Sequence, residues 1–221
     1  MQSKAILLDI DGTLVDANDM HVLAREEAFA TVGAWFDRQP IYNQIGKGTD
    51  MLARTLLPDA DETQQEKFGD THGAIFKAEY LETAKPFAHA HDLLARAHGL
   101  GEQVVLASSA SASELGRYID LLDARDLIAA TTSSDDAEKT KPAPDIFATA
   151  PEKFPGIDPS EVIVVGDTPY DIEAAAKRAI AAAAVRSGRF KDEQLPGAGA
   201  ITIYDDVAAL LAGYRTSPLG R

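Results

Sequence analysis

Two aspartates separated by a single residue, Asp9 and Asp11, are the side chains of this sequence best placed to do chemistry. They follow an apolar run at 5–8 that has the length and composition of a buried strand. Because side chains alternate along a strand, both carboxylates can point to the same side if the extended geometry continues that far. Two carboxylates so close repel each other unless a cation lies between them or one holds a proton. Gly12 permits an unusual turn and Thr13 adds a hydroxyl, so this segment is typical of a nucleophile assisted by a metal ion.

A predicted sheet must position these side chains. Five further short apolar runs follow along the chain, at 104–107, 127–130, 162–165, 182–185 and 200–203. The segments between them carry apolar residues at the spacing of amphipathic helices. Helix starts are marked by capping residues at Ser111, Thr168 and Asp205-Asp206. Strands that alternate with amphipathic helices predict an α/β fold, with a mainly parallel, Rossmann-like sheet and helices on both faces.

The stretch 17–85 breaks this alternation. It is mostly polar, has helical periodicity and shows no convincing strand. We therefore predict an all-helical domain inserted after the first strand, with Pro86 marking the return to the core. The α/β catalytic core then comprises residues 1–16 and 86–221. The last residues, 216–221, are predicted to be a frayed tail.

The composition of the 221-residue chain limits the partners and the chemistry that the protein can have. An apolar fraction of 45% is sufficient for a sizeable core, whereas a formal charge of −14 argues against nucleic acid and anionic lipid as partners. The chain has no cysteine, which excludes disulfides and thiol catalysis. No run approaches the roughly 18 apolar residues of a membrane span and no leader precedes the first strand, so we expect a cytoplasmic protein. The composition leaves open whether it is a monomer or a homodimer.

The residues that follow the predicted strands sample the expected site, because ligands of open α/β sheets bind beyond the carboxyl ends of the strands. Asp9 follows the first run, and Ser108 and Ser109 follow the second. Lys141 lies in the loop after the third run, and Asp167 follows the fourth. Carboxylates, hydroxyls and a lysine at one sheet edge suit phosphoryl transfer, which needs a nucleophile, a divalent cation and donors around the phosphoryl oxygens.

Four segments, in this order, resemble the four motifs of the haloacid dehalogenase superfamily. They are Asp9-Ile10-Asp11-Gly12-Thr13, Ser108, Lys141-Pro142 and Gly166-Asp167-Thr168-Pro169-Tyr170-Asp171. The stretch 17–85 is similar to the helical cap that these enzymes carry after the first motif. The resemblance covers nearly the whole chain and implies a phosphatase that acts on a small phosphorylated metabolite.

The resemblance implies a role for each of these residues. Asp9 would be the nucleophile that forms an aspartyl-phosphate intermediate. Asp11 would be the general acid toward the leaving oxygen and then the base toward water, and the neighbouring carboxylate would favour its protonated form. Ser108, with Ser109 beside it, would bind phosphoryl oxygens. Lys141 would neutralise charge on Asp9 and on the transferred group.

A metal site follows from the same motifs. Asp167 would be a direct ligand, and Asp171 lies about one helical turn further on, so it can face the same site. The alternative for Asp171 is an acidic residue that stabilises the start of a helix. Together with Asp9 and the main-chain carbonyl of Asp11, these ligands are all oxygens, which points to Mg²⁺.

Four residues of the predicted cap are candidates for substrate contact. Gly46 and Lys47 could place backbone N–H groups and a cation over the substrate, or form a turn before the next helix. His21 and Lys77 fall where related caps contact substrate, and each has a purely structural alternative. The sequence leaves these alternatives open.

The resemblance also leaves alternatives for the reaction. A sugar-phosphate mutase similar to β-phosphoglucomutase is the main rival of a phosphatase. Minor alternatives are an enzyme similar to phosphonoacetaldehyde hydrolase and a binding module that has lost turnover. The presence of Asp11 favours phosphate-ester chemistry, because phosphonate and haloacid enzymes of this superfamily lack the second aspartate of the first motif.

Overall fold

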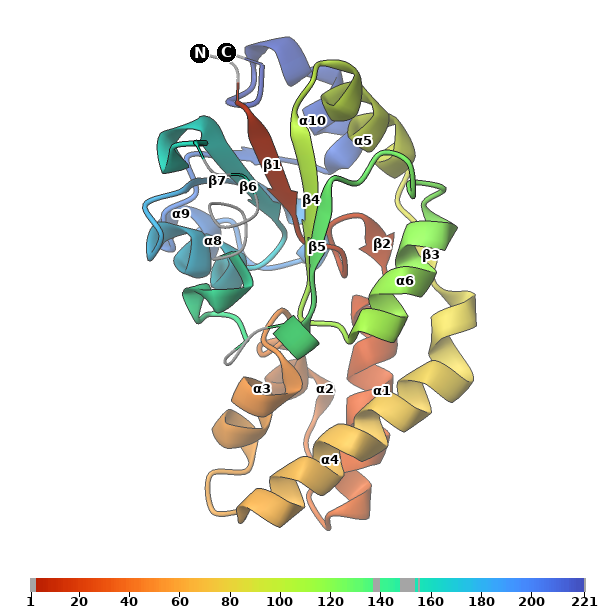
Figure 1. Cartoon of the computed structure of the whole chain (residues 1–221). Coiled ribbons are helices and arrows are strands. Elements are labelled where there is room, and N and C mark those ends of the chain that lie inside the picture. The colour runs from red at the N-terminus through yellow and green to blue at the C-terminus, as the bar shows by residue number, and fades with distance from the viewer. Residues whose placement is uncertain (1–2, 137–139, 148–153, 155, 221) are drawn as a thin grey trace.

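A six-stranded parallel sheet forms the centre of the computed structural model, which describes residues 3–136, 140–147, 154 and 156–220 (Figure 1). In spatial order its strands are β5 (Ala130–Thr132), β4 (Gln103–Ala107), β1 (Ala5–Leu8), β6 (Val162–Gly166), β7 (Ala181–Val185) and β8 (Thr202–Tyr204). Leu8 of the central strand lies opposite Leu106 and Val165 of its two neighbours. The carboxyl ends of β1, β4 and β6 therefore meet at one edge of the sheet.

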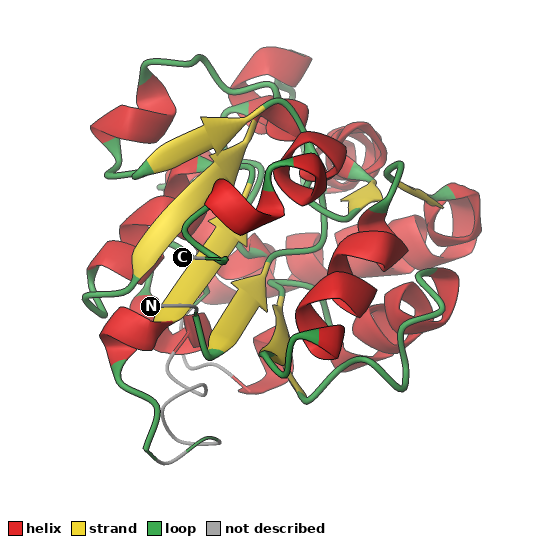
Figure 2. Cartoon of the chain, turned by 90° about the horizontal axis from the view of Figure 1, so that it is seen from above, coloured by secondary structure: helices red, strands yellow, loops and turns green. Residues whose placement is uncertain are grey.

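Helices cover both faces of the sheet, as the sequence predicts (Figure 2). Ile6 and Leu8 face α5 (Ala90–Gly99), α6 (Ala112–Leu121) and α10 (Val207–Ala212). Ala5 and Leu7 face the opposite layer, which contains α8 (Pro169–Ala176) and α9 (Gln194–Gly197). Single 3₁₀ turns occur at Ser134–Asp136, Pro144–Phe147, Pro159–Glu161, Arg186–Gly188 and Tyr214–Thr216. Within the described residues, every helix falls short of the length or apolarity needed to cross a bilayer.

Residues 17–85, here called the helical segment, lie beyond the carboxyl edge of the sheet (Figure 1). They form α1 (Asn18–Thr31), α2 (Arg38–Tyr42), α3 (Thr49–Leu56) and α4 (Glu62–Ile75), followed by a π-helical turn at Phe76–Tyr80 and a 3₁₀ turn at Leu81–Thr83. The helical segment has an apolar cluster of its own, built around Phe29, Leu52 and Phe68. At its base, β2 (Val15–Asp16) pairs antiparallel with β3 (Lys85–Pro86). This two-stranded ribbon joins the helical segment to the sheet, and its pairing was not predicted from the sequence.

Two strands and the C-terminal tail differ from the predictions. The third strand begins at Ala130 rather than at 127, because Ala130, Thr131 and Thr132 pair with β4. The last strand is likewise displaced, to Thr202–Tyr204. The predicted frayed tail is wrong for its described part: Leu219 is fully buried in the core, and its carbonyl oxygen accepts a 3.1 Å hydrogen bond from Ser3 Oγ.

The predicted helix starts are present. Ser111 and Glu114 form a capping box at the start of α6, and Asp206 caps α10 by accepting a hydrogen bond from the Ala209 N–H group. Thr168 caps α8 in the same way, with Asp171 as its partner. These local hydrogen bonds satisfy N–H groups that a helix leaves without partners in its first turn.

Candidate active site

Three aspartates converge where β1 and β6 end. Asp9 follows β1, Asp167 follows β6, and Asp171 lies in the first turn of α8. All three are buried, and one carboxylate oxygen of each lies within 4.8 Å of the others. The structure therefore brings together three of the side chains that the sequence proposes as metal ligands.

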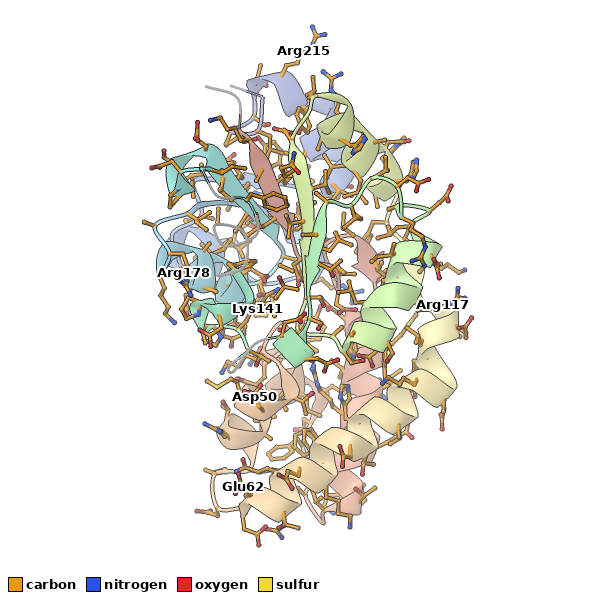
Figure 3. The ribbon with its side chains drawn as sticks, in the orientation of Figure 1. Asp50, Glu62, Arg117, Lys141, Arg178 and Arg215 are labelled. Atoms are coloured by element: carbon orange, nitrogen blue, oxygen red, sulfur yellow. The ribbon has the colours of Figure 1, made fainter. Side chains whose placement is uncertain are left out.

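Lys141 supplies the positive charge of this cluster. Its side chain is fully buried, and its Nζ atom forms ion pairs with Asp9 and, at 2.8 Å, with Asp171 Oδ1. The same nitrogen donates a 3.1 Å hydrogen bond to the carbonyl oxygen of Ala107 at the end of β4. Although burial alone would lower the pKa of Lys141, the carboxylates of Asp171 and Asp9 outweigh it and raise that pKa. The lysine is therefore held in its charged form. Figure 3 locates Lys141 at the edge of the sheet that faces the helical segment.

The cluster carries an excess of negative charge. Burial raises the pKa of Asp9 to about 7 against the opposing effect of Lys141, and the charges of Asp171 and Asp11 add to the increase. Burial, followed by the charges of Asp9 and Asp171, also raises the pKa of Asp167 well above its usual range. When all three carboxylates are ionised, they exceed the charge of the one ammonium group by two, which a single divalent cation would balance. An all-oxygen set of this kind fits a hard divalent cation such as Mg²⁺.

Hydrogen bonds fix Asp167 from two directions. Thr13 Oγ1 donates to Asp167 Oδ1 at 2.9 Å, and Asn18 Nδ2 donates to Asp167 Oδ2 at 3.0 Å. Gly12 has φ +81°, and a Cβ atom there would lie 2.1 Å from Asp167 Oδ2. Asn18 was not identified from the sequence, and its Oδ1 atom is buried without a hydrogen-bond partner among the described residues. The Oδ1 atom of Asn18 is therefore a further oxygen available to the site.

Asp171 takes part in the start of α8 and also faces the charge cluster, and its role as a metal ligand stays a prediction. Its Oδ2 atom accepts hydrogen bonds from Thr168 N at 3.0 Å and Thr168 Oγ1 at 2.7 Å, which fixes the start of α8. Its Oδ1 atom forms the 2.8 Å ion pair with Lys141. The residue is therefore both the capping-box partner of Thr168 and a member of the buried charge cluster.

Asp11 lies apart from the three clustered carboxylates. Its Oδ1 atom lies 3.3 Å from His21 Nε2, and the other nitrogen of His21 lies 3.3 Å from His72 Nε2. Burial tends to raise the pKa of Asp11, but the charge and hydrogen bond of His21 outweigh it and lower that pKa. In the free site His21 therefore opposes the protonated form of Asp11, and the role of Asp11 as general acid stays a prediction. Metal contact through its main-chain carbonyl stays a prediction.

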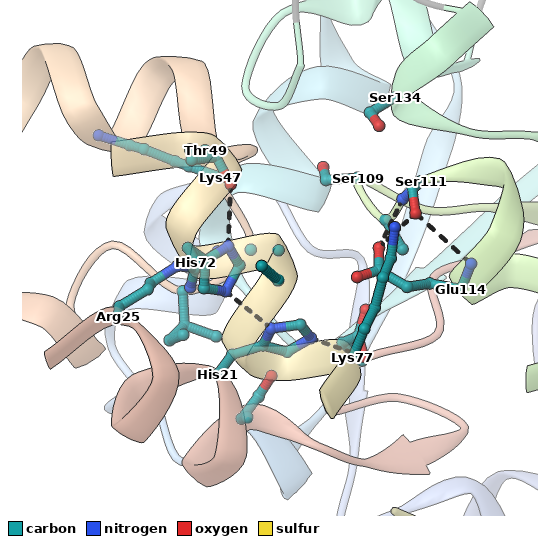
Figure 4. Close-up of a pocket in the computed structure, with 18 of the residues that line it drawn as sticks. His21, Arg25, Lys47, Thr49, His72, Lys77, Ser109, Ser111, Glu114 and Ser134 are labelled. Carbon is teal, nitrogen blue, oxygen red and sulfur yellow. Dashed lines mark hydrogen bonds and ion pairs between the residues drawn. The ribbon is translucent and has the colours of Figure 1, made fainter. Parts of the chain in front are cut away.

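A cavity of about 520 Å³ separates the sheet edge from the helical segment (Figure 4). Asp9, Asp11 and Ser109 line it from the core. The four predicted cap residues line it from the other side: Gly46, Lys47, His21 and Lys77. All four lie at the cavity that the predicted substrate would occupy.

The two serines after β4 differ in their surroundings. Ser108 is fully buried, and its Oγ atom accepts a 3.0 Å hydrogen bond from the Ala110 N–H group. Ser109 lines the cavity, and its buried Oγ atom has no hydrogen-bond partner among the described residues. Of the two serines, Ser109 is thus the one that lines the cavity and keeps an unpaired hydroxyl among the described residues.

The cap candidates also have structural contacts. Lys47 Nζ donates a 2.6 Å hydrogen bond to Gln44 and lies 4.8 Å from the centre of the Tyr170 ring. Gly46 has φ +93°, and a Cβ atom there would approach Thr168 to 2.6 Å. Lys77 is exposed. Gly46 therefore allows the helical segment to approach the cap of α8 closely.

Arg25 and His72 also line the cavity and were not identified from the sequence. Arg25 lies four residues after His21 on α1, so the two share a helix face. That spacing was a signal available in the sequence. His72 comes from α4, and only the packing of α4 against α1 places it at the cavity.

Polar contacts join the helical segment to the core. Tyr42 donates a 3.0 Å hydrogen bond to the carbonyl oxygen of Gly188, and Tyr170 donates a 2.6 Å hydrogen bond to that of Asn43. Thr140, which precedes Lys141 in the sequence, donates a hydrogen bond to Asp50 of α3. The helical segment is therefore closed down on the sheet edge in this structure.

The fold and the buried acidic site are those of a family of α/β enzymes. The family model of haloacid dehalogenase-like hydrolases matches residues 6–185. The chain belongs to this family. The sequence resemblance is thereby confirmed at the level of the family.

Two named proteins are similar to this chain at 26% and 27% identity. A phosphoglycolate phosphatase of Aquifex aeolicus is 26% identical over 176 residues, which cover 77% of this chain and 79% of that protein. Protein CbbY of Cereibacter sphaeroides is 27% identical over 185 residues, which cover 78% and 79%. Among solved structures, a hydrolase from Pseudomonas syringae has a TM-score of 0.89 at 23% identity, covering 96% of this chain and 98% of that one. The structural likeness shows that the fold is shared along nearly the whole chain.

Proposed function

We propose that this protein is a Mg²⁺-dependent phosphatase that hydrolyses a small phosphomonoester through an aspartyl-phosphate formed on Asp9. The observation that carries the proposal is the arrangement around Lys141. This buried cation pairs with Asp9 and Asp171, and Asp167 completes a set of oxygens within 4.8 Å. A nucleophile, a fixed positive charge and a set of metal ligands are the parts that phosphoryl transfer requires.

Asp9, Asp167 and Asp171 would hold the metal ion, together with the main-chain carbonyl of Asp11. Bound there, Mg²⁺ would supply positive charge to the phosphoryl oxygens. The buried, oxygen-only donor set and the raised pKa values of Asp9 and Asp167 support this assignment.

The residues of the chain divide the reaction between them. A carboxylate oxygen of Asp9 attacks phosphorus, and Lys141 offsets the negative charge of both reactants. Ser109, with Ser108 beside it, donates to the transferred group. Asp11 gives a proton to the leaving oxygen, and then takes one from the water that attacks the phosphorus of the intermediate and frees Asp9. The negative charge of a bound phosphoryl group raises the proton affinity of Asp11, which His21 lowers in the free site.

We further propose that the helical segment is a cap domain on a core made of residues 1–16 and 86–221. The cavity lies between the two parts, and the short ribbon of β2 and β3 is the place where they are joined. Closure of a cap excludes water during transfer, and opening releases product. A cavity of about 520 Å³ suits a small metabolite, which agrees with the name phosphoglycolate phosphatase carried by one relative.

Release of inorganic phosphate from p-nitrophenyl phosphate tests the proposal. We expect release with Mg²⁺, none after chelation, and none from Asp9→Asn in a protein that keeps its circular dichroism spectrum. Asp126→Asn, which changes an exposed aspartate remote from the cavity, is the matched control and should behave as wild type. Activity of Asp9→Asn near that of wild type would refute the nucleophile. Isomerisation of a sugar phosphate that depends on a bisphosphate primer would instead favour the mutase alternative.

A further inference from the structure

One cation at the cavity, Arg25, has no anionic partner among the described residues. It extends from α1, and only 6% of the residue is exposed. Its Nε atom is buried without a hydrogen-bond partner in the described part of the chain. A buried guanidinium normally has such partners, because its desolvation is costly without them.

The two carboxylates whose charges act on Arg25 have other hydrogen-bond partners, and neither forms an ion pair with Arg25 among the described residues. Asp11 faces His21 at 3.3 Å. Glu114 accepts hydrogen bonds from Ser111 N at 2.8 Å and Ser111 Oγ at 2.7 Å, within the capping box of α6. Burial lowers the pKa of Arg25 to about 10, and the charges of Asp11 and Glu114 oppose that effect. The guanidinium is therefore charged at neutral pH and keeps free donors.

The other basic groups at the cavity differ from Arg25. Lys47 donates a 2.6 Å hydrogen bond to Gln44, and Lys77 is exposed to solvent. Burial and then the charge of Arg25 lower the pKa of His72 well below its usual range, so His72 is neutral. Figure 4 shows Arg25 beside His72 on the side of the cavity that the helical segment forms. Arg25 is thus a desolvated cation on the wall opposite the core residues.

We propose that Arg25 binds a second anionic group of the substrate, a carboxylate or a second phosphate at the end remote from the transferred phosphoryl group. The planar guanidinium fork matches both oxyanions and binds them through paired hydrogen bonds. The inference rests on the proposed function, because Asp9 at the same cavity would receive the phosphoryl group. It adds the substrate class: phosphomonoesters with an anionic tail.

Three small esters test the substrate class: 2-phosphoglycolate, ethane-1,2-diyl bisphosphate, and ethyl phosphate, which has an uncharged tail. We expect the wild type to prefer one of the two anionic compounds over ethyl phosphate by at least about tenfold in kcat/KM. Arg25→Met should reduce that preference to within about threefold, and Arg25→Lys should keep part of it, because it retains the charge without the fork. The matched control, Arg54→Met, removes an exposed arginine of α3 and should leave the preference unchanged. Which anionic ester is preferred identifies the tail as carboxylate or phosphate.

Two outcomes would overturn the inference. One is a wild type without preference for an anionic tail, which decides the matter even if Arg25→Met does not fold. The other is an equal loss on all three esters in a folded Arg25→Met, which would indicate a structural role. Hydrolysis of p-nitrophenyl phosphate without any tail preference would refute this inference alone, whereas no hydrolysis of any ester would refute the proposed function. If no ester is hydrolysed, calorimetry of 2-phosphoglycolate and ethyl phosphate binding to Asp9→Asn still measures the preference for an anionic tail.

Discussion

Lys141 Nζ lies 2.8 Å from Asp171 Oδ1, and both side chains are fully buried at the carboxyl edge of the sheet. The same ammonium group pairs with Asp9. One cation is therefore shared by Asp171, a member of the capping box of α8, and by the proposed nucleophile. Buried ions of this kind are stable only with their partners, so stability and chemistry depend on the same contacts.

Lys141→Met should lower the free energy of unfolding by about 3–5 kcal/mol in the absence of metal, because it leaves buried carboxylates without their cation. The double variant Lys141→Met/Asp171→Asn should recover part of this loss. Urea denaturation of both variants and of Asp171→Asn alone measures these effects. Lys67→Met, at an exposed position, is the control and should stay within about 0.5 kcal/mol of wild type. Losses that simply add in the double variant would contradict the shared ion pair.

Magnesium affinity should rise with pH between about 6 and 8. Without metal, burial raises the pKa of Asp9 to about 7 and that of Asp167 well above its usual range, so a binding cation must displace protons at the lower pH. Each displaced proton weakens the apparent affinity by at most about tenfold per pH unit below the pKa. Calorimetry in buffers of different ionisation enthalpy counts the protons released. Equal affinity and no proton release at pH 6 and pH 8 would show that the carboxylates are already ionised.

Asn18→Ala should weaken Mg²⁺ binding by about 10–100-fold, since it removes the 3.0 Å hydrogen bond that orients Asp167. Asn43→Ala, which changes an exposed asparagine, provides the comparison. Titration of Mg²⁺ against both variants by calorimetry measures the difference. An unchanged dissociation constant in Asn18→Ala would mean that Thr13 alone holds the carboxylate.

Glu102 provides a test outside the site. It is buried, accepts hydrogen bonds from Ser3 and Tyr214, and its burial raises its pKa above the ordinary value of 4.5. As pH rises from 4.5 through the raised pKa, the folded state holds more protons than the unfolded one, so the free energy of unfolding falls. Glu102→Gln has no proton to lose at this position, so its free energy of unfolding does not fall for this reason. Its melting temperature minus that of wild type should therefore increase from pH 5 to pH 8.

The exposed Glu66→Gln is the control for this pH dependence. Its melting temperature should differ from that of wild type by the same amount at both pH values. A difference for Glu102→Gln that shrank as pH rose would contradict the assigned direction of the pKa shift.

The positions of Asp9, Lys141 and Asp167 could be anticipated because parallel strands end at one edge of a sheet. An apolar run therefore locates the residue that follows it. The third strand was misplaced for a related reason: Thr131 and Thr132 continue the pairing with β4, and a hydropathy pattern does not register such polar residues. The buried Leu219 was missed because a chain end carries no periodicity that reveals its packing.

The helical segment could be anticipated as helical, but its contacts could not. Asn18, Arg25 and His72 reach the site only through the way α1 and α4 pack and lie over the sheet edge. Helical spacing predicts which residues share a helix face, but it does not predict which other element that face contacts. The pairing of Asp11 with His21, which reverses the expected direction of its pKa shift, is a consequence of that packing.

Chemical trapping would show whether Asp9 carries the phosphoryl group during turnover. Wild-type protein would be mixed with Mg²⁺ and a phosphomonoester, quenched in acid within one turnover, digested, and analysed by mass spectrometry. We predict one phosphoryl group on the carboxylate of Asp9, and none in Asp9→Asn treated in the same way. A phosphoryl group on any other residue of the wild type would contradict the account.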